Sequence, residues 1–147
     1  EKAINGIDAI DICSKALNIA NKNKQKHKTK NVNLIQQNFF NKINRKSYDL
    51  IISNPPYISK LEYSDLDKHI RLYEPQIALT DNNQGLDFYR FFSKNLFKIL
   101  KPKGKIILEI GIEKNKAIIE KLFIKNDFQY KWHKDLNGDY RVIELYK

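Results

Sequence analysis

The sequence predicts an α/β fold built on a mostly parallel β-sheet that ends in an antiparallel hairpin. Two observations carry this prediction. Short runs rich in β-branched residues alternate with longer amphipathic stretches, as expected of repeated strand–helix units. The last runs, Gln129–Lys134 and Tyr140–Tyr146, flank Asn137-Gly138, a sequence typical of a hairpin turn. A length of 147 residues fits one domain, and we expect residues 1–147 to form it.

The first half of the chain supplies three strands and one helix. The helix is expected to begin with Ser14 as its N-cap and to place Ala16, Leu17, Ile19 and Ala20 on one face. Lysines alternate with polar residues in Asn21–Asn31, which is typical of a solvated helix end and loop. The three strands are expected at Gly6–Ile12, Val32–Gln36 and Tyr48–Ser53.

The second half begins with an irregular segment, Ile58–Gln84, whose length favours an active-site cover over an ordinary connection. A helix is then expected over Leu86–Leu100 and ends at Lys101–Gly104. Its apolar side chains at helical spacing are Phe88, Phe92, Leu96 and Ile99. A strand at Lys105–Ile110 and a helix at Lys114–Asn126 follow, the helix being expected to bury Ile118, Leu122 and Phe123.

The composition excludes several classes of protein. No apolar run has the 18 or so residues that a membrane span needs. A single cysteine, Cys13, excludes an internal disulfide and favours a reducing compartment, so we expect a cytoplasmic setting, an organelle being the alternative. The net charge of +10 invites nucleic-acid binding, but only 4 of the 27 basic residues are Arg, the better phosphate ligand.

Asn54-Pro55-Pro56-Tyr57 is the most informative motif, because it directly follows an apolar strand. Ligands of open α/β sheets bind beyond the carboxyl ends of the strands. The prolines fix the backbone and remove two N–H groups, so that the side-chain oxygen of Asn54 and the carbonyl of Pro55 can accept both hydrogens of an –NH2 group. Tyr57 can pack on the plane of that group. The alternative is a simple turn followed by a buried tyrosine.

Several segments together resemble the release-factor glutamine methyltransferases, the HemK/PrmC family of class I S-adenosylmethionine-dependent enzymes. The matching segments are AIDICSKAL at 9–17, QNFF at 37–40, YDLIISNPPYI at 48–58, EPQIAL at 74–79, GLDFYR at 85–90, IILEIG at 106–111 and DYRV at 139–142. The motif NPPY is shared with adenine-N6 and guanine-N2 methyltransferases, whereas EPxxAL, GLDFYR and LEIG are more specific. The resemblance implies a Rossmann-like fold and methylation of glutamine N5 in the Gly-Gly-Gln loop of a peptide chain release factor during translation termination.

The resemblance assigns residue roles. Asn54, Pro55 and Tyr57 correspond to catalytic positions, with Pro56 beside them at the substrate and Asn54 also near the cofactor. Asp11 corresponds to the acid that binds the cofactor ribose, its alternative being a surface acid that caps the next helix. Asn38 stands where relatives carry an Asp that binds adenine. Phe39 could lie against the adenine, although core packing is the alternative for Phe39 and Phe40.

Further charged or titratable residues carry weaker expectations. Glu74 corresponds to a position that could hold the cover over the substrate. Glu109 ends a strand at the same sheet edge as Asn54, where it could support the site or simply accept backbone hydrogen bonds. Arg141 is expected to form a structural ion pair. The histidines show no ligand spacing, so no metal and no covalent nucleophile are expected.

One motif of the resembled family is missing. Class I methyltransferases carry a glycine-rich loop after their first strand, but the five glycines of this chain are isolated. We therefore expect the C-terminal part of a longer protein, without that strand, its loop and the N-terminal helical domain. Two alternatives stay open: a methyltransferase for amino groups of nucleic acids, and a catalytically inactive fragment or binding module.

Overall fold

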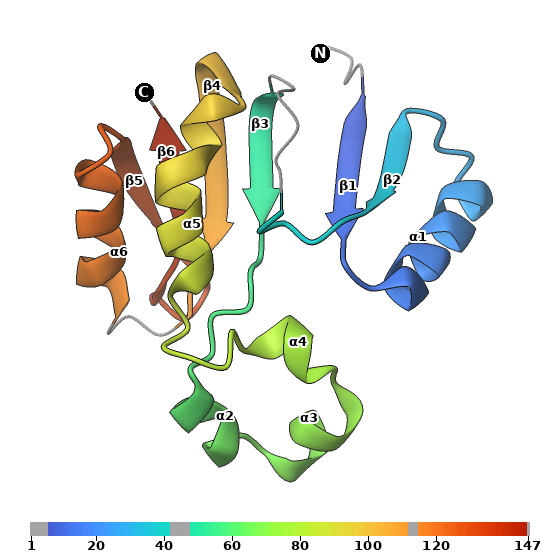
Figure 1. The fold of residues 1–147 in the computed structure, drawn as a ribbon, viewed down its shortest axis with the longest axis horizontal. Coiled ribbons are helices and arrows are strands. Elements are labelled where there is room, and N and C mark those ends of the chain that lie inside the picture. The colour runs from blue at the N-terminus through green and yellow to red at the C-terminus, as the bar shows by residue number, and fades with distance from the viewer. Residues whose placement is uncertain (1–5, 42–47, 112–114, 147) are drawn as a thin grey trace. The chain divides into compact units, whose positions relative to one another are not determined.

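The computed structural model describes residues 6–41, 48–111 and 115–146. The elements are β1 (Ile7–Asp11), α1 (Ser14–Lys26), β2 (Val32–Gln36), β3 (Tyr48–Ser53), α2 (Lys60–Asp65), α3 (Lys68–Tyr73), α4 (Gln76–Leu79), α5 (Asp87–Asn95), the 3-10 helix η1 (Leu96–Lys98), β4 (Leu100–Glu109), α6 (Lys116–Ile124), β5 (Gln129–Lys134) and β6 (Tyr140–Tyr146) (Figure 1). The chain forms two compact units, Glu1–Asn44 (unit 1) and Arg45–Lys147 (unit 2).

Unit 1 contains two parallel strands and one helix. β1 pairs with β2 in a register that sets Ile7 opposite Val32 and Asp11 opposite Gln36. The expected N-cap at Ser14 is wrong by one residue: Cys13 has the extended backbone of a cap, and Ser14 is already helical. Ile19 is 61% exposed and does not lie on a buried face of α1. In the described part of unit 1 no residue is buried.

Unit 2 is built on a four-stranded sheet in the order β3-β4-β6-β5. β3 and β4 run parallel, whereas β6 lies antiparallel to both of its neighbours. The expected α/β class, with parallel strands followed by an antiparallel hairpin, is confirmed. The core of unit 2 joins apolar side chains from the sheet, α5, η1 and α6; its fully covered members include Phe92, Leu96, Ile106, Phe123 and Leu145.

β4 begins five residues earlier than the sequence predicts. Leu100 pairs with Tyr48, and the next pair is Leu50 with Lys105, so a bulge separates the two ends of this ladder. Lys103 within the bulge has a positive φ of 65°. The helical stretch before it correspondingly ends in η1 rather than continuing to Leu100. Pairing with a distant strand thus overrides the local helical pattern.

The buried face of α6 differs from the expected one by a single position. Ile119 and Phe123 are fully covered, whereas Ile118 is 45% exposed. Leu122 is half-buried. The expected start of this helix at Lys114 lies outside the described residues. Four apolar residues within six positions are compatible with two alternative buried faces, and the structure buries the one that includes Ile119 rather than Ile118.

The segment between β3 and α5 consists of the three short helices α2, α3 and α4, none of which has a buried residue. Both of its ends are fastened near the carboxyl end of β3. Ile58 and Thr80 form an isolated parallel bridge, and the Lys60 N–H donates to the carbonyl of Asn83 at 2.9 Å. The irregular sequence at 58–84 therefore forms a helical excursion whose two ends meet beside the NPPY motif.

Candidate active site

The motif Asn54–Tyr57 lies directly beyond the carboxyl end of β3, as the sequence predicts. Asn54 is exposed, Pro55 is buried, and Pro56 and Tyr57 are half-buried. An exposed carboxamide is thus held on a buried and rigid backbone, because proline fixes φ. This arrangement leaves the amide of Asn54 accessible to a bound molecule.

Tyr57 is held by contacts along its whole length. Its hydroxyl donates to Oε1 of Glu109 at 3.1 Å. A Cβ added to Gly111 would stand 2.7 Å from Cδ2 of the ring, and a Cβ on Gly85 would collide with the Tyr57 carbonyl. Gly85 also has a φ of +74°, which side-chain-bearing residues rarely adopt. Glycine at both positions lets two other segments approach the tyrosine closely.

The carboxylate of Glu109 is joined to the site by its hydrogen bond from the hydroxyl of Tyr57. It ends β4, and the register places Leu108 opposite Ser53, so Glu109 follows beside Asn54. The hydroxyl of Tyr89, which is 1% exposed, donates to the Glu109 carbonyl at 2.7 Å. Burial, followed by the charge of Glu109 and the hydrogen bond to it, raises the pKa of Tyr57. Tyr57 is therefore protonated and remains a donor at neutral pH.

Arg141 forms the structural pairing that the sequence predicts. Its Nε donates to Oδ2 of Asp135 at 3.2 Å, and its Nη1 donates to the carbonyl of Gly111 at 3.2 Å. Asp135 also accepts from backbone N–H groups in the turn between β5 and β6. These bonds, partly offset by burial, hold the pKa of the Asp135 carboxyl below its usual range. Arg141 thus ties the hairpin to the backbone that supports Tyr57.

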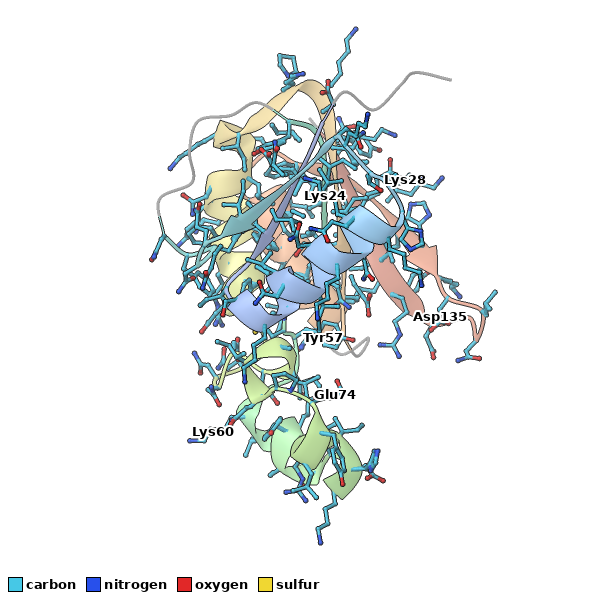
Figure 2. The ribbon with its side chains drawn as sticks, turned by 90° about the vertical axis from the view of Figure 1, so that its right-hand side faces the viewer. Lys24, Lys28, Tyr57, Lys60, Glu74 and Asp135 are labelled. Atoms are coloured by element: carbon cyan, nitrogen blue, oxygen red, sulfur yellow. The ribbon has the colours of Figure 1, made fainter. Side chains whose placement is uncertain are left out.

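Glu74 lies apart from this cluster. It is exposed at the carboxyl end of α3, where its N–H donates to the Ile70 carbonyl. In the described part of the chain no hydrogen bond or ion pair joins Glu74 to Asn54–Tyr57. Figure 2 draws Glu74 among the helices of this excursion and Tyr57 where they meet the sheet of unit 2.

The candidate cofactor residues stand together at the carboxyl edge of the unit 1 sheet. Asp11 ends β1 and Asn38 follows β2, and the two strands are parallel neighbours. Oδ1 of Asp11 accepts from the Cys13 N–H at 2.7 Å, which is the local capping contact weighed as its alternative role. Oδ1 of Asn38 accepts from the Phe40 N–H at 3.0 Å. Asp11 is exposed and Asn38 is half-buried.

The two phenylalanines beside Asn38 are not core residues in the described part of unit 1. Phe39 is half-buried and Phe40 is 41% exposed. The apolar ring of Phe39 and the acceptor oxygens of Asp11 and Asn38 are the kinds of group that bind a nucleoside, whose ribose hydroxyls and amino group are donors. Among the described residues no cluster of His, Cys, Asp or Glu is arranged to hold a metal ion.

Sequence reasoning did not identify Tyr89 or the Tyr57–Glu109 bond. Tyr89 lies within the GLDFYR segment at the start of α5, one residue after the expected apolar position Phe88. Helical spacing from Phe92 back to Tyr89 could have placed it on the buried face.

None of the helices in the described ranges is long and apolar enough to cross a membrane.

Comparisons with known proteins agree on one class. A family model described as a methyltransferase domain matches residues 5–138. The release factor glutamine methyltransferase of Fusobacterium nucleatum is 44% identical over 138 residues, which are 93% of this chain and 39% of that protein. A bifunctional methyltransferase of Rickettsia felis is 39% identical over 137 residues, 92% of this chain and 26% of its own.

The structural comparison shows the fold. The crystal structure of a methyltransferase from Pyrococcus furiosus matches with a TM-score of 0.69 at 20% identity, covering 95% of this chain and 61% of that one. The chain spans well under half the length of the two curated relatives above. The family match, the strand pairing and the shared fold establish that this chain belongs to the methyltransferase domain family, with the Rossmann-like fold of the class I methyltransferases.

Proposed function

We propose that this chain forms part of an S-adenosylmethionine-dependent protein methyltransferase. Its acceptor would be the side-chain amide nitrogen (N5) of the glutamine in the Gly-Gly-Gln loop of a peptide chain release factor. The observation that carries the proposal is the Asn54–Tyr57 corner, with an exposed amide on a buried backbone beyond β3. The name of the Fusobacterium nucleatum relative supports the choice of acceptor.

A carboxamide nitrogen is a poor nucleophile because its lone pair is delocalised into the carbonyl. In the proposed reaction, Oδ1 of Asn54 and the carbonyl of Pro55 accept hydrogen bonds from the two N–H groups of the acceptor. Positive charge grows on this nitrogen as it forms its new bond to carbon, and the two oxygens stabilise that charge. Neither residue acts as a base, and the leaving proton passes to solvent.

Tyr57 would pack against the plane of the acceptor amide and hold it in line for attack, since positioning supplies most of the catalysis in a displacement of this kind. Pro56 would contact the acceptor beside Tyr57. Glu74, on the helical excursion beside the motif, would contact the protein that carries the glutamine.

The residues of unit 1 fit a nucleoside-containing methyl donor. The carboxylate of Asp11 can accept from both ribose hydroxyls, as acids do at this position in dinucleotide-binding folds. Asn38 keeps an acceptor oxygen for an adenine amino group, and Phe39 offers a ring for its face. S-adenosylmethionine, when bound, would supply the methyl group as an electrophile, with the methyl–sulfur bond breaking and S-adenosylhomocysteine as the leaving group.

A labelling experiment tests the acceptor. The full-length protein that contains this chain is incubated with S-adenosylmethionine carrying a tritiated methyl group, a purified release factor and total RNA. We expect label in the release factor, and its loss when the Gly-Gly-Gln glutamine is replaced by alanine. Label in RNA would instead support methylation of nucleic-acid amino groups, which the net charge of +10 permits.

A binding experiment separates an active enzyme from an inactive module. Calorimetry with S-adenosylmethionine should give saturable binding to the full-length protein. A silent titration, together with no label in either acceptor, would contradict the proposed function and favour an inactive module.

A further inference from the structure

We propose that Glu109 is a positioning residue that holds Tyr57 in the orientation required for methyl transfer; this inference rests on the proposed function. Tyr57 follows two prolines on a connection rather than on a strand, so the backbone alone does not fix the outer end of its side chain. The bond from its hydroxyl to Oε1 of Glu109, at 3.1 Å, supplies that missing constraint.

The constraint is effective because Glu109 comes from a rigid element. β4 is paired on both sides, with β3 in parallel and with β6 antiparallel, where Glu109 faces Val142. The buried hydroxyl of Tyr89 donates to the Glu109 carbonyl at 2.7 Å and fixes the backbone from which the carboxylate projects. A side chain that projects from a central strand can therefore hold a side chain on a loop in one position.

The tyrosine is then fixed at three places. Gly85 packs on its backbone carbonyl, Gly111 packs so closely on its ring that an added Cβ would stand 2.7 Å from Cδ2, and Glu109 binds its hydroxyl. Displacing the ring would shift the acceptor amide that packs on it, and misplacement of about 1 Å can cost a hundredfold in rate. Glu109 would thus act through Tyr57 without contact with the reacting atoms.

The protonation state of Tyr57 is compatible with a permanent hydrogen bond from its hydroxyl to Glu109. Burial and the adjacent carboxylate raise the pKa of Tyr57, and Arg141 opposes this shift weakly. The phenol therefore stays protonated throughout the neutral range and donates continuously. Because a carboxamide oxygen can accept the same hydrogen bond, Glu109→Gln keeps the constraint, whereas Glu109→Ala removes it.

Steady-state kinetics of the full-length protein test the role. We expect Glu109→Ala and Tyr57→Phe each to lower kcat about 10- to 100-fold with KM for S-adenosylmethionine changed less than about threefold. The double variant should be no slower than the worse single one, since both changes break one bond. Glu109→Gln should recover kcat to within about threefold of the wild-type enzyme.

Glu144→Gln is the matched control. Glu144 lies on β6 in the same sheet and binds Lys105 and His133 instead of Tyr57, so its neutralisation should leave kcat unchanged. Additive losses in the double variant, or an undiminished kcat in Tyr57→Phe, would overturn the positioning role. If Glu109→Ala does not fold, as judged by circular dichroism, Tyr57→Phe and Glu109→Gln still decide the question.

A spectroscopic measurement separates this inference from the proposed function. In protein labelled with ¹³Cζ-tyrosine, the Tyr57 resonance is assigned by its absence from Tyr57→Phe. Its titration midpoint should lie above that of an ordinary tyrosine and should fall in Glu109→Ala but not in Glu144→Gln. Were no methyl transfer found in the wild-type protein, this titration would still report whether the Tyr57–Glu109 bond exists, because a midpoint that Glu109→Ala leaves unchanged would refute the bond.

Discussion

Unit 1 and unit 2 bury their apolar residues to very different extents. Unit 2 has a core in which six or more large side chains, such as Phe92, Phe123 and Leu145, are at most 2% exposed. In the described part of unit 1 no residue is buried, and Ile7, Ile10 and Ile12 are each about 40% exposed. Both units nevertheless place polar side chains at the carboxyl end of parallel strands.

This difference in burial indicates how firmly each unit holds its candidate site residues in place. Apolar burial is the main favourable contribution to folding, so unit 2 can hold its candidate acceptor residues rigidly by itself. Unit 1, taken by itself, has one parallel strand pair and one helix with no buried residue, so burial within this unit stabilises Asp11 and Asn38 far less. The acceptor residues should therefore be preorganised, and the candidate cofactor residues should gain order from what they bind.

The largest expected effect is on stability. Phe123→Ala in α6 should lower the free energy of unfolding by about 3–5 kcal/mol because it leaves a cavity in the core. Leu17→Ala in α1 should cost about 1 kcal/mol or less, since Leu17 is only half-buried. Circular dichroism in denaturant follows the unfolding of both units, and the fluorescence of Trp132, the single tryptophan, follows that of unit 2. Equal losses from the two substitutions would show that the units do not differ in this way.

The second-largest effect is expected on the rate of methyl transfer, from Asn54→Ala. Removing one of the two proposed acceptors of the amide hydrogens should reduce kcat about 10²- to 10³-fold. The affinity for S-adenosylmethionine should change little, because the candidate ribose and adenine contacts come mainly from other residues, Asp11, Asn38 and Phe39. Rate assays and calorimetry on the same preparation check this. A parallel loss of affinity and rate would contradict the assigned role.

Asp11→Ala should have the opposite effect to Asn54→Ala, lowering the affinity for S-adenosylmethionine more than kcat. Loss of a charged hydrogen-bond acceptor should weaken S-adenosylmethionine binding about 10- to 100-fold, while kcat at saturation changes little. Asp8→Ala is the matched control, because Asp8 lies on the same strand and its Oδ1 accepts from Asn33 instead. If both variants bind the methyl donor equally well, the capping contact to Cys13 is the whole role of Asp11.

The smallest effect concerns pH. Lys105 and His133 bind the two oxygens of Glu144 and hold the pKa of its carboxyl below the ordinary value. A lowered folded pKa means that this contribution to stability is present above the unfolded pKa and is lost as the pH falls through the folded one. Glu144→Gln should therefore lose less stability than the wild type on acidification. Thermal unfolding at neutral and acidic pH measures the difference, and identical losses would contradict it.

Most of the strands were predictable because their ends are marked locally. Pro55 and Pro56 end β3 since proline cannot donate to a ladder, and Asn137-Gly138 separates β5 from β6. The start of β4 was not predictable, because Leu100 becomes a strand residue only through its pairing with Tyr48. Such long-range pairing leaves no local trace in the sequence.

The candidate site shows the same limit. The position of Asn54–Tyr57 after a strand follows from the sequence alone, and so does the placement of Asp11 and Asn38 after neighbouring strands. The Tyr57–Glu109 bond depends on the register of β3 against β4 and on the close approach of Gly111, neither of which the sequence specifies. Residue types predicted the chemistry, whereas the contacts between them required the structure.

The strand order of unit 2 also constrains how the sheet assembles. β6 follows β5 along the chain yet lies between β5 and β4. β5 therefore joins the parallel strands only through β6. During synthesis the backbone groups of β5 stay unpaired in the sheet until the residues up to Tyr146 have left the ribosome. Docking of the hairpin therefore completes the sheet late in synthesis, and Arg141 acquires its bonds to Asp135 and Gly111 only then.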